Sequence, residues 1–306
     1  MTRPGLGAYA LLVALALVWG GSFMFIKIGV ATIPPVTLTA LRMITGAVVL
    51  IVAALMARQS LPRERAVWGS IALVALFGNA LPFSLIGWGE EVIDSGLAAI
   101  LMAGMPLFTL VCAHFATDDE KMNRRKLIGV LFGLAGLIVL IGPGKLSQLG
   151  EDAVRQLAVA AASLCYGINA LFIRRIKGVP AKALAAGVMI ASIPMIVPMA
   201  FVMEQPLQLE PTGASLTAGI VLGVFQTALA TLMMLTLIRR QGATFFSQIN
   251  FIVPLAGVVY GVIFLAERPQ PSAFAALALI LIGIYIVRTG GMGVVSADAP
   301  LSKLRE

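Results

Sequence analysis

A small number of polar side chains interrupt the long apolar runs of this chain. Asn79, Asn169, Gln226, Gln248 and Asn250 carry amides, which both donate and accept hydrogen bonds. An amide therefore suits the carboxylate as well as the ammonium of a zwitterion. Because polar groups within a lipid phase are costly, those that occur there tend to be functional. These residues predict a cavity with apolar walls and a few polar contacts for a small amphipathic solute.

The predicted cavity set includes aromatic and hydroxyl residues as well as amides. Its members are Trp19, Ser22, Asn79, Ser84, Trp88, Tyr166, Asn169, Gln226, Ser247, Gln248 and Asn250. In the alternative interpretation the amides join helices through interhelical hydrogen bonds. For Trp88 the alternative is a place in the aromatic belt at the membrane interface.

Two basic residues, Lys27 and Arg42, lie at the end of one apolar run and within the next. We favour the interpretation that both side chains extend to the outer headgroups. The alternative is a basic outer vestibule that meets the carboxylate of a leaving solute.

Acidic residues are missing from the middle of every apolar run, since Glu90, Glu91 and Asp94 fall in a predicted outer loop. Proton-linked carriers commonly use an intramembrane carboxylate. We therefore expect any transport by this chain to be passive or weakly linked to protons.

Two prolines stand at the start of related apolar segments. Pro106 precedes Asp119 by 13 residues, and Pro254 precedes Glu267 by the same 13 residues. A proline removes a helical hydrogen bond and permits bending. We predict that Pro106 and Pro254 act as hinges, and the alternative is a static kink at each.

The elements that must position these residues are apolar helices of membrane length. The chain has 306 residues, of which 59% are hydrophobic and only 12% charged. An apolar segment of about 20 residues spans a bilayer, so the composition predicts an all-α polytopic membrane protein. Ten spans are expected, at 6–26, 36–57, 66–88, 93–115, 127–141, 156–173, 183–203, 215–238, 243–266 and 272–287.

Lysine and arginine are distributed unevenly between the two ends of these spans. The terminal segment and the loops on its side hold 17 of the 22 basic residues, whereas the other side holds Lys145, Arg155 and Arg268. Basic residues favour the cytoplasmic side. We therefore expect a multi-pass protein of the cell (inner) membrane with both termini in the cytoplasm.

The sequence contains an internal repeat. Trp19–Gly20 followed by Phe25–Lys27 matches Tyr166–Gly167 followed by Phe172–Arg174, at an offset of 147 residues. We expect two five-helix halves, 1–145 and 150–289, and a disordered cytoplasmic tail, 290–306. Because five is odd, the second half is inverted relative to the first, as in many secondary transporters.

Four segments resemble the drug/metabolite transporter superfamily, in its EamA-type branch of ten-helix exporters. They are VWGGSFMFIKIGV in the first span, PPVTLTALR in the second, GLAAILMAGMPLF in the fourth and VPLAGVVYGVIFLAERPQPSAFAALALILIGIYIV across the last two. The resemblance covers residues 8–289. It implies export of amino acids or other small metabolites, and this chain is most similar to the exporters that accept aromatic and other apolar side chains.

Other classes of function fit the sequence less well. The chain has one histidine and neither a phosphate-binding glycine loop with lysine nor a pair of buried acids, so we expect no enzyme, cofactor or metal site. The basic residues that give the chain its net charge of +8 lie in short loops between the spans, which argues against a nucleic-acid partner. A broad drug or metabolite exporter stays open. A sugar-phosphate or nucleotide-sugar carrier is disfavoured, because a phosphate needs several central basic groups. Besides a small-molecule substrate and membrane lipids we expect no partner, and a monomer.

Overall fold

The computed structural model describes residues 4–116, 122–141 and 151–290. Within these ranges the chain forms helices and no strand. The predicted tail, residues 290–306, lies outside the described part except for its first residue. The acidic residues Asp118, Asp119 and Glu120, one of which ends the first proline-to-acid segment, also lie outside it.

The first half of the chain contains five apolar helical segments, two of which are subdivided. In order these are α1 (Leu6–Val30), α2 (Pro35–Met56), α3 (Arg65–Ala75) with η1 (Leu76–Ala80) and α4 (Leu81–Glu90), α5 (Ser95–Met102) with α6 (Met105–Ala116), and α7 (Arg124–Ile141).

The second half repeats this order of long and subdivided segments. It consists of α9 (Glu151–Ile173), α10 (Ala181–Met203), α11 (Gly213–Val221) with η3 (Leu222–Leu229) and α12 (Ala230–Gln241), α13 (Ala243–Phe246) with α14 (Ile249–Leu265), and α15 (Pro271–Gly290). A short 3₁₀ turn, η2 (Pro206–Gln208), follows α10.

The lengths and composition of these segments confirm an all-α polytopic membrane fold. Eight helical segments of the described chain are long and apolar enough to cross a membrane, and α14 is a shorter apolar helix. The remaining segment, α7, begins with three basic residues and continues as an apolar helix. Each of the ten predicted spans therefore has a helical counterpart.

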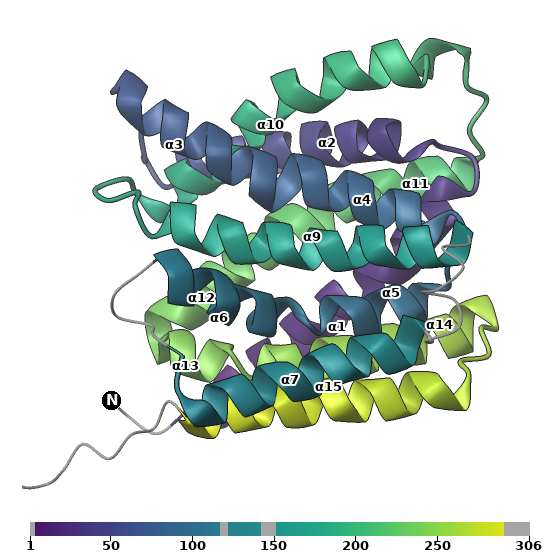
Figure 1. Cartoon of the computed structure of the whole chain (residues 1–306). Coiled ribbons are helices and arrows are strands. Elements are labelled where there is room, and N and C mark those ends of the chain that lie inside the picture. The colour runs from purple at the N-terminus through teal and green to yellow at the C-terminus, as the bar shows by residue number, and fades with distance from the viewer. Residues whose placement is uncertain (1–3, 117–121, 142–150, 291–306) are drawn as a thin grey trace, which may run out of the picture.

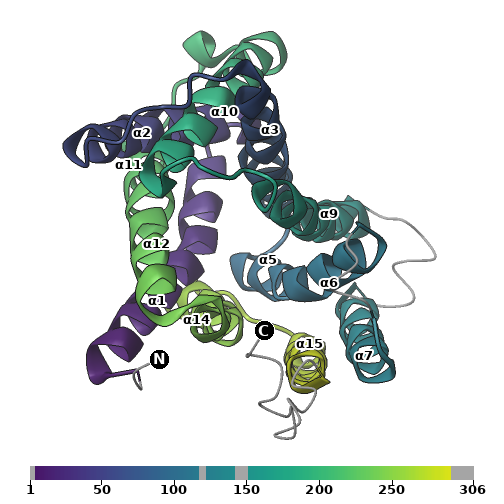
Figure 2. The ribbon, with the colours of Figure 1, turned by 90° about the vertical axis from the view of Figure 1, so that its left-hand side faces the viewer.

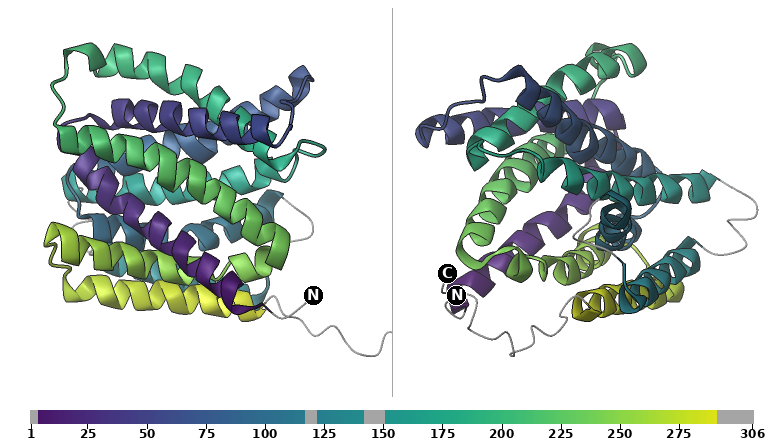
Figure 3. Two further views of the ribbon diagram at one scale, coloured as in Figure 1. Left: turned by 180° about the vertical axis from the view of Figure 1, so that it is seen from behind. Right: turned by 60° about the vertical axis from the view of Figure 1, so that its left-hand side comes forward.

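The helices run side by side along one direction, so that the bundle has two ends (Figure 1). Seen from behind, α1 is inclined across its neighbours (Figure 3). The start of α1 and the loops that join α2 to α3 and α9 to α10, which carry several basic residues, lie at one end, which Figure 2 views directly and which we call the basic face. The other end, where α4, α10 and α14 finish, is called the opposite face.

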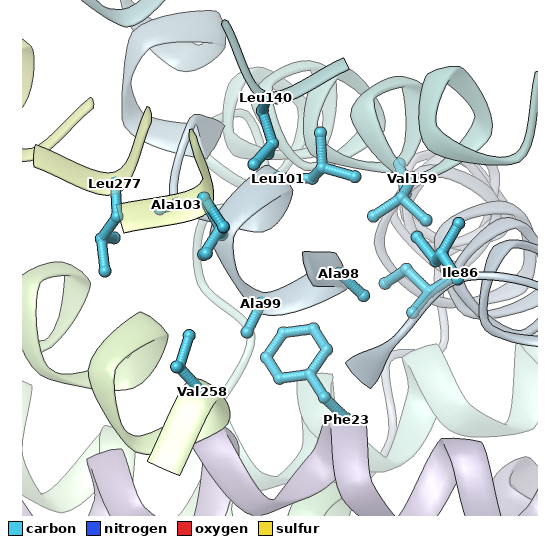
Figure 4. Close-up of a cluster of buried hydrophobic side chains, with 14 of the residues drawn as sticks. Phe23, Ile86, Ala98, Ala99, Leu101, Ala103, Leu140, Val159, Val258 and Leu277 are labelled. Atoms are coloured by element: carbon cyan, nitrogen blue, oxygen red, sulfur yellow. The ribbon is translucent and has the colours of Figure 1, made fainter. Parts of the chain in front are cut away.

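The main hydrophobic core joins both halves of the chain. Phe23 of α1 lies among Ala98 and Ala99 of α5 and Val258 of α14 (Figure 4). Glycines allow these helices to approach closely. A Cβ added at Gly20 would lie 2.5 Å from the Cβ of Ala256 and 3.1 Å from the backbone of α14. The residues of α1 that reach the centre are therefore held by tight packing on both sides.

The pair α7 and α15 is packed even more closely, along a stripe of glycines. A Cβ added at Gly129 would lie 2.6 Å from the carbonyl oxygen of Gly283, and one at Gly136 would lie 2.9 Å from that of Ala276. Small residues let helix backbones meet in this way within membranes. The fifth and tenth spans thus form one unit at the edge of the bundle (Figure 2).

Side chains at the helix ends also join the two halves. At the opposite face, the Glu204 carboxylate after α10 accepts hydrogen bonds from the first amides of α2, at Val36 and Thr37 (3.0 and 2.6 Å). At the basic face, Gln59 Oε1 after α2 accepts from the first amides of α10, at Lys182 and Ala183 (3.0 and 3.3 Å). Helices α2 and α10 are therefore linked at both ends.

Candidate functional site

Two π-helical segments occupy the middle of the third and eighth spans. The segment η1 contains Asn79, and η3 contains Gln226. These two amides are separated by 147 residues, the offset of the internal repeat. Because π-helical turns are frequent at functional sites, the matched pair marks the centre of the bundle as the candidate site.

Arg42 of α2 lies in this centre and not at a headgroup level. Its side chain is 5% exposed. Its Nε donates to the Thr227 hydroxyl of η3 at 2.7 Å, and its guanidinium carbon lies 3.6 Å from the centre of the Phe83 ring of α4. The interpretation of Arg42 as a snorkelling residue is therefore wrong. Its side chain is buried between Phe83 of the first half and Thr227 of the second half and does not extend to the headgroups.

The guanidinium of Arg42 retains unused hydrogen-bonding capacity. Its hydrogen bond to Thr227 uses Nε alone, and neither terminal nitrogen has a hydrogen-bond partner among the described residues. The Thr227 hydroxyl in turn donates to the carbonyl of Leu222 at 2.9 Å, which fixes its lone pairs toward Arg42. A buried cation with free donors matches an anionic ligand such as a carboxylate.

Aromatic rings surround this cation and its neighbours. The ring centres of Phe83 and Tyr166 are 6.5 Å apart. On the other side of the site, the Trp19 indole nitrogen donates to the carbonyl of Gln226 at 3.2 Å, and its ring meets Phe246 edge-on with 6.0 Å between centres. Trp19 and Tyr166, which the repeat relates, therefore both lie beside the π-helical segments.

The other predicted amides and hydroxyls of the central spans have mixed environments. Asn79 donates to the Ser192 hydroxyl at 3.3 Å, and Ser84 to the carbonyl of Ala80 and the hydroxyl of Thr39 (2.8 and 3.5 Å). The side-chain oxygens of Asn169 and Gln226 are buried without a partner among the described residues. Ser22 is also buried. These last three residues have capacity left for a solute.

Four further predicted residues lie at or near helix ends. Trp88 is 37% exposed and stacks under Arg155 near the opposite face, an arrangement that fits an interfacial residue. Ser247 and Gln248 lie between α13 and α14, and Asn250 is the second residue of α14. That these four line a substrate cavity remains a prediction.

The prolines differ in their local structure. Pro106 is the second residue of α6, directly after the turn at Ala103–Gly104 that separates α5 from α6. Pro254 lies inside the continuous helix α14. The helix is thus interrupted at the first proline only, and the hinge role of both remains a prediction.

Two cavities open at the faces of the bundle. One of ≈ 320 Å³ at the basic face is lined by Gln59, Ala181, Lys182, Leu232, Leu235, Thr236 and Arg239. One of ≈ 230 Å³ at the opposite face has Asp94, Gln156 and Glu267 in its wall. Neither was predicted. The lining of the first includes Leu232, the residue directly after Thr231, whose hydroxyl donates to the Thr227 carbonyl.

Glu90 corrects the prediction that all acids of its segment lie in a loop. It is the last residue of α4 and is 0% exposed. Lys27, which is partly exposed, is bound within the protein, because its ammonium donates to the carbonyls of Glu90 and Ile93 at 2.7 and 2.8 Å. Asp94, beyond the helix, has a pKa raised by burial and then by the nearby Glu267 carboxylate.

Sequence reasoning missed Arg42, Phe83, Thr227 and Glu90 as members of buried polar sites. The repeat offset of 147 pairs polar residues only within the predicted set, Ser22 with Asn169 and Asn79 with Gln226. No comparable signal exists for Arg42, whose equivalent position is Met189. Among the described residues no group of His, Cys, Asp and Glu is placed to hold a metal ion.

Comparisons with known proteins agree on one family. The profile of the EamA-like transporter family matches residues 6–142 and 155–289. The chain is 25% identical over 276 residues to an uncharacterized transporter, YoaV, of Bacillus subtilis, covering 90% of this chain and 94% of YoaV. It is 26% identical over 295 residues to the uncharacterized inner membrane transporter YedA of Escherichia coli K12, covering 94% and 92%.

One solved crystal structure shares the fold. It superimposes with a TM-score of 0.66 at 21% sequence identity, and the match covers 94% of this chain and 99% of the other. At that identity the likeness concerns the fold alone.

Proposed function

Because the chain belongs to the EamA-like transporter family, we propose that it exports amino acids with aromatic or other apolar side chains, or similar small metabolites. Export proceeds across the inner membrane, by alternating access about the central site, between two inverted five-helix halves. The sequence repeat and the mirrored links between α2 and α10 support this division into halves.

The observation that carries the proposal is the environment of Arg42. Its terminal nitrogens are free of described partners and stand beside the aromatic rings of Phe83 and Tyr166. A carboxylate pairs with a guanidinium through two parallel hydrogen bonds, and the adjoining rings favour an apolar or aromatic side chain. The unpartnered oxygens of Asn169 and Gln226 suit the ammonium group.

A route from the basic face supports the direction of movement. Lys182 and Arg239 line the 320 Å³ cavity there, and both attract a carboxylate. From this cavity the face of α12 leads to Thr231 and Thr227, the partner of Arg42. With the basic face in the cytoplasm, as the distribution of Lys and Arg favours, the solute enters from the cell interior.

The test uses purified protein in liposomes loaded with a radiolabelled aromatic amino acid. We expect protein-dependent release that is lost in Arg42→Gln and retained in Arg63→Gln, a matched control whose side chain is exposed in a loop. Intact folding of both variants is checked by size-exclusion chromatography and thermal unfolding. Equal release by Arg42→Gln and wild-type protein would contradict the role of Arg42.

The same release assay tests one alternative function, and the structure bears on a second. Release of cationic dyes but not of amino acids would support the broad drug or metabolite exporter. A sugar-phosphate carrier is disfavoured, because Arg42 is the one cation within the central site in the described part of the chain and Lys27 is engaged by carbonyls near the opposite face.

A further inference from the structure

The buried carboxyl group of Glu90 has no role in the proposed substrate site. Its residue is 0% exposed, although it ends a helix one residue before a loop. Neither carboxyl oxygen has a hydrogen-bond partner among the described residues. Glu91, the next residue, is instead partly exposed and forms an ion pair with Arg155.

The charged groups around Glu90 come from every element that packs near it. Lys27 of α1 binds the Glu90 carbonyl, not its carboxyl group. Arg42 of α2 donates to Thr227 through Nε alone, and its terminal nitrogens form no hydrogen bond with the Glu90 carboxyl oxygens. Arg155 of α9 is engaged by Glu91 and the Trp88 carbonyl. The nearby acids are Asp94 and Glu267, and the latter accepts from the amides of Ser95 and Gly96. No described cation is paired with the Glu90 carboxyl group.

A carboxylate buried without a partner is unstable in its charged form. Moving an ion out of water costs far more than any unpaired polar group, and in proteins such a group becomes neutral instead. Both Glu90 carboxyl oxygens are themselves closed to solvent, and Ile93 and Ser95, which follow in the chain, are only 4% and 0% exposed. In this form of the molecule, in which water does not reach its carboxyl group, Glu90 is therefore neutral.

We propose that Glu90 is a proton-binding site that controls closure of the opposite face, with the proton supplied by the outer solution. This inference rests on the proposed alternating access. When the face opens, water reaches the end of α4 and Glu90 ionises at neutral pH, as an ordinary glutamate does. When the face closes, the carboxylate takes up one proton from outside. External acid therefore favours the closed form.

The proton returns to the side from which it came. Each cycle of opening and closing releases and rebinds it at the opposite face, so no proton crosses the membrane. The closed-to-open ratio changes by up to about tenfold per pH unit, because the two forms differ by one bound proton. The site thus regulates flux by external pH and is compatible with transport that is not driven by protons.

The first experiment detects the proton itself and needs no substrate. We expect the infrared spectrum of the purified protein in lipid nanodiscs at neutral pH to contain the carbonyl stretch of a protonated carboxyl group. This band should be absent from Glu90→Gln, shifted in Glu90→Asp and retained in Glu210→Gln, whose side chain is exposed on the same face. An unchanged band in both Glu90 variants would overturn the proposal.

The second experiment measures closure. Spin labels replace Val92 and Leu207, which are 38% and 86% exposed at the opposite face, in a background without Cys112 and Cys165. Electron–electron distances are recorded between about pH 5 and about pH 8, the range in which a single proton shifts the equilibrium. The short-distance fraction should rise with acid in wild-type protein and stay constant in Glu90→Gln. The same pH slope in both would overturn the proposal, even if transport itself were confirmed.

Discussion

The two ends of the α2–α10 pair are linked by the same construction with different chemistry. At the basic face the neutral amide of Gln59 accepts from the first amides of α10. At the opposite face the carboxylate of Glu204 accepts from those of α2. The chain reverses at both places through a left-handed residue, Arg58 and Gln205, which are 147 positions apart.

The difference indicates which end of the bundle is held more strongly. Hydrogen bonds to a carboxylate are roughly twice as strong as neutral ones, and the N-terminus of a helix favours negative charge. A second carboxylate, Glu267, binds the first amides of α5 at the opposite face. The opposite face therefore has two carboxylate contacts to helix N-termini, whereas the link between α2 and α10 at the basic face is neutral.

The largest effect is expected when the charges of Glu204 and Glu267 are both removed from the opposite face. The double variant Glu204→Gln and Glu267→Gln should lower the free energy of unfolding by about 3 kcal/mol, since hydrogen bonds to charged groups contribute roughly 1.5–3 kcal/mol each. Unfolding by SDS in mixed micelles measures it, and Glu210→Gln is the control. A loss no greater than that of the control would show that the faces do not differ in strength.

The converse variant gives the basic face the chemistry of the opposite one. Gln59→Glu should raise the free energy of unfolding by about 1 kcal/mol, because a carboxylate at a helix N-terminus is favourable. The gain should vanish at acidic pH, where the introduced group is neutral. A gain that is independent of pH would mean that packing, and not charge, is responsible.

The turns themselves offer a comparison of backbone conformation. Arg58 before Gln59 and Ala266 before Glu267 have φ angles of 52° and 54°, a conformation that glycine adopts without strain. Arg58→Gly and Ala266→Gly should each raise the free energy of unfolding by about 0.5–1 kcal/mol. The two gains should be equal in the same unfolding assay, since the backbone conformations match. A marked difference would show that the two turns are not equivalent.

The smallest effect concerns Asp94 beside Glu267. Because its pKa is raised in the folded protein, the folded state binds a proton more readily than the unfolded state. Its contribution to stability is therefore present at low pH and is lost as pH rises through that pKa. Asp94→Asn should raise the free energy of unfolding slightly at neutral pH, by less than about 0.5 kcal/mol, because the residue is only partly shielded from solvent, which screens the interaction. The gain should shrink in acid, and a gain that grows in acid would contradict the sign.

The fold was largely predictable because hydropathy reports the length of each span. All ten predicted spans coincide with helices to within a few residues, since an apolar run of bilayer length has few alternatives. The interruptions were not predictable. A π-helical turn such as η1 or η3 leaves the composition of the run unchanged, so periodicity and hydropathy do not register it.

The candidate site was predictable in part. Trp19, Tyr166, Asn79 and Gln226 are unusual in an apolar sequence, and the structure places all four near the centre. The position of Arg42 was misjudged, because hydropathy shows where along a span a residue lies but not whether its side chain faces lipid or the interior of the bundle. Its partner Thr227 lies 185 residues away. Glu90 was misjudged because it opens the acid-rich stretch 90–94, which resembles a solvated loop.

The glycine contact between α7 and α15 constrains the order in which the protein is made. Gly129 in the fifth span meets Gly283 in the tenth, about 150 residues later, and contacts so far apart in sequence form late. While the ribosome is still producing the second half, Gly129 and Gly136 of α7 have no α15 against which to pack. A chain that ends before residue 271 lacks its partner permanently. Biosynthesis of the first half is therefore complete only when the last helix has left the translocon, and truncated products should be recognised there as unassembled.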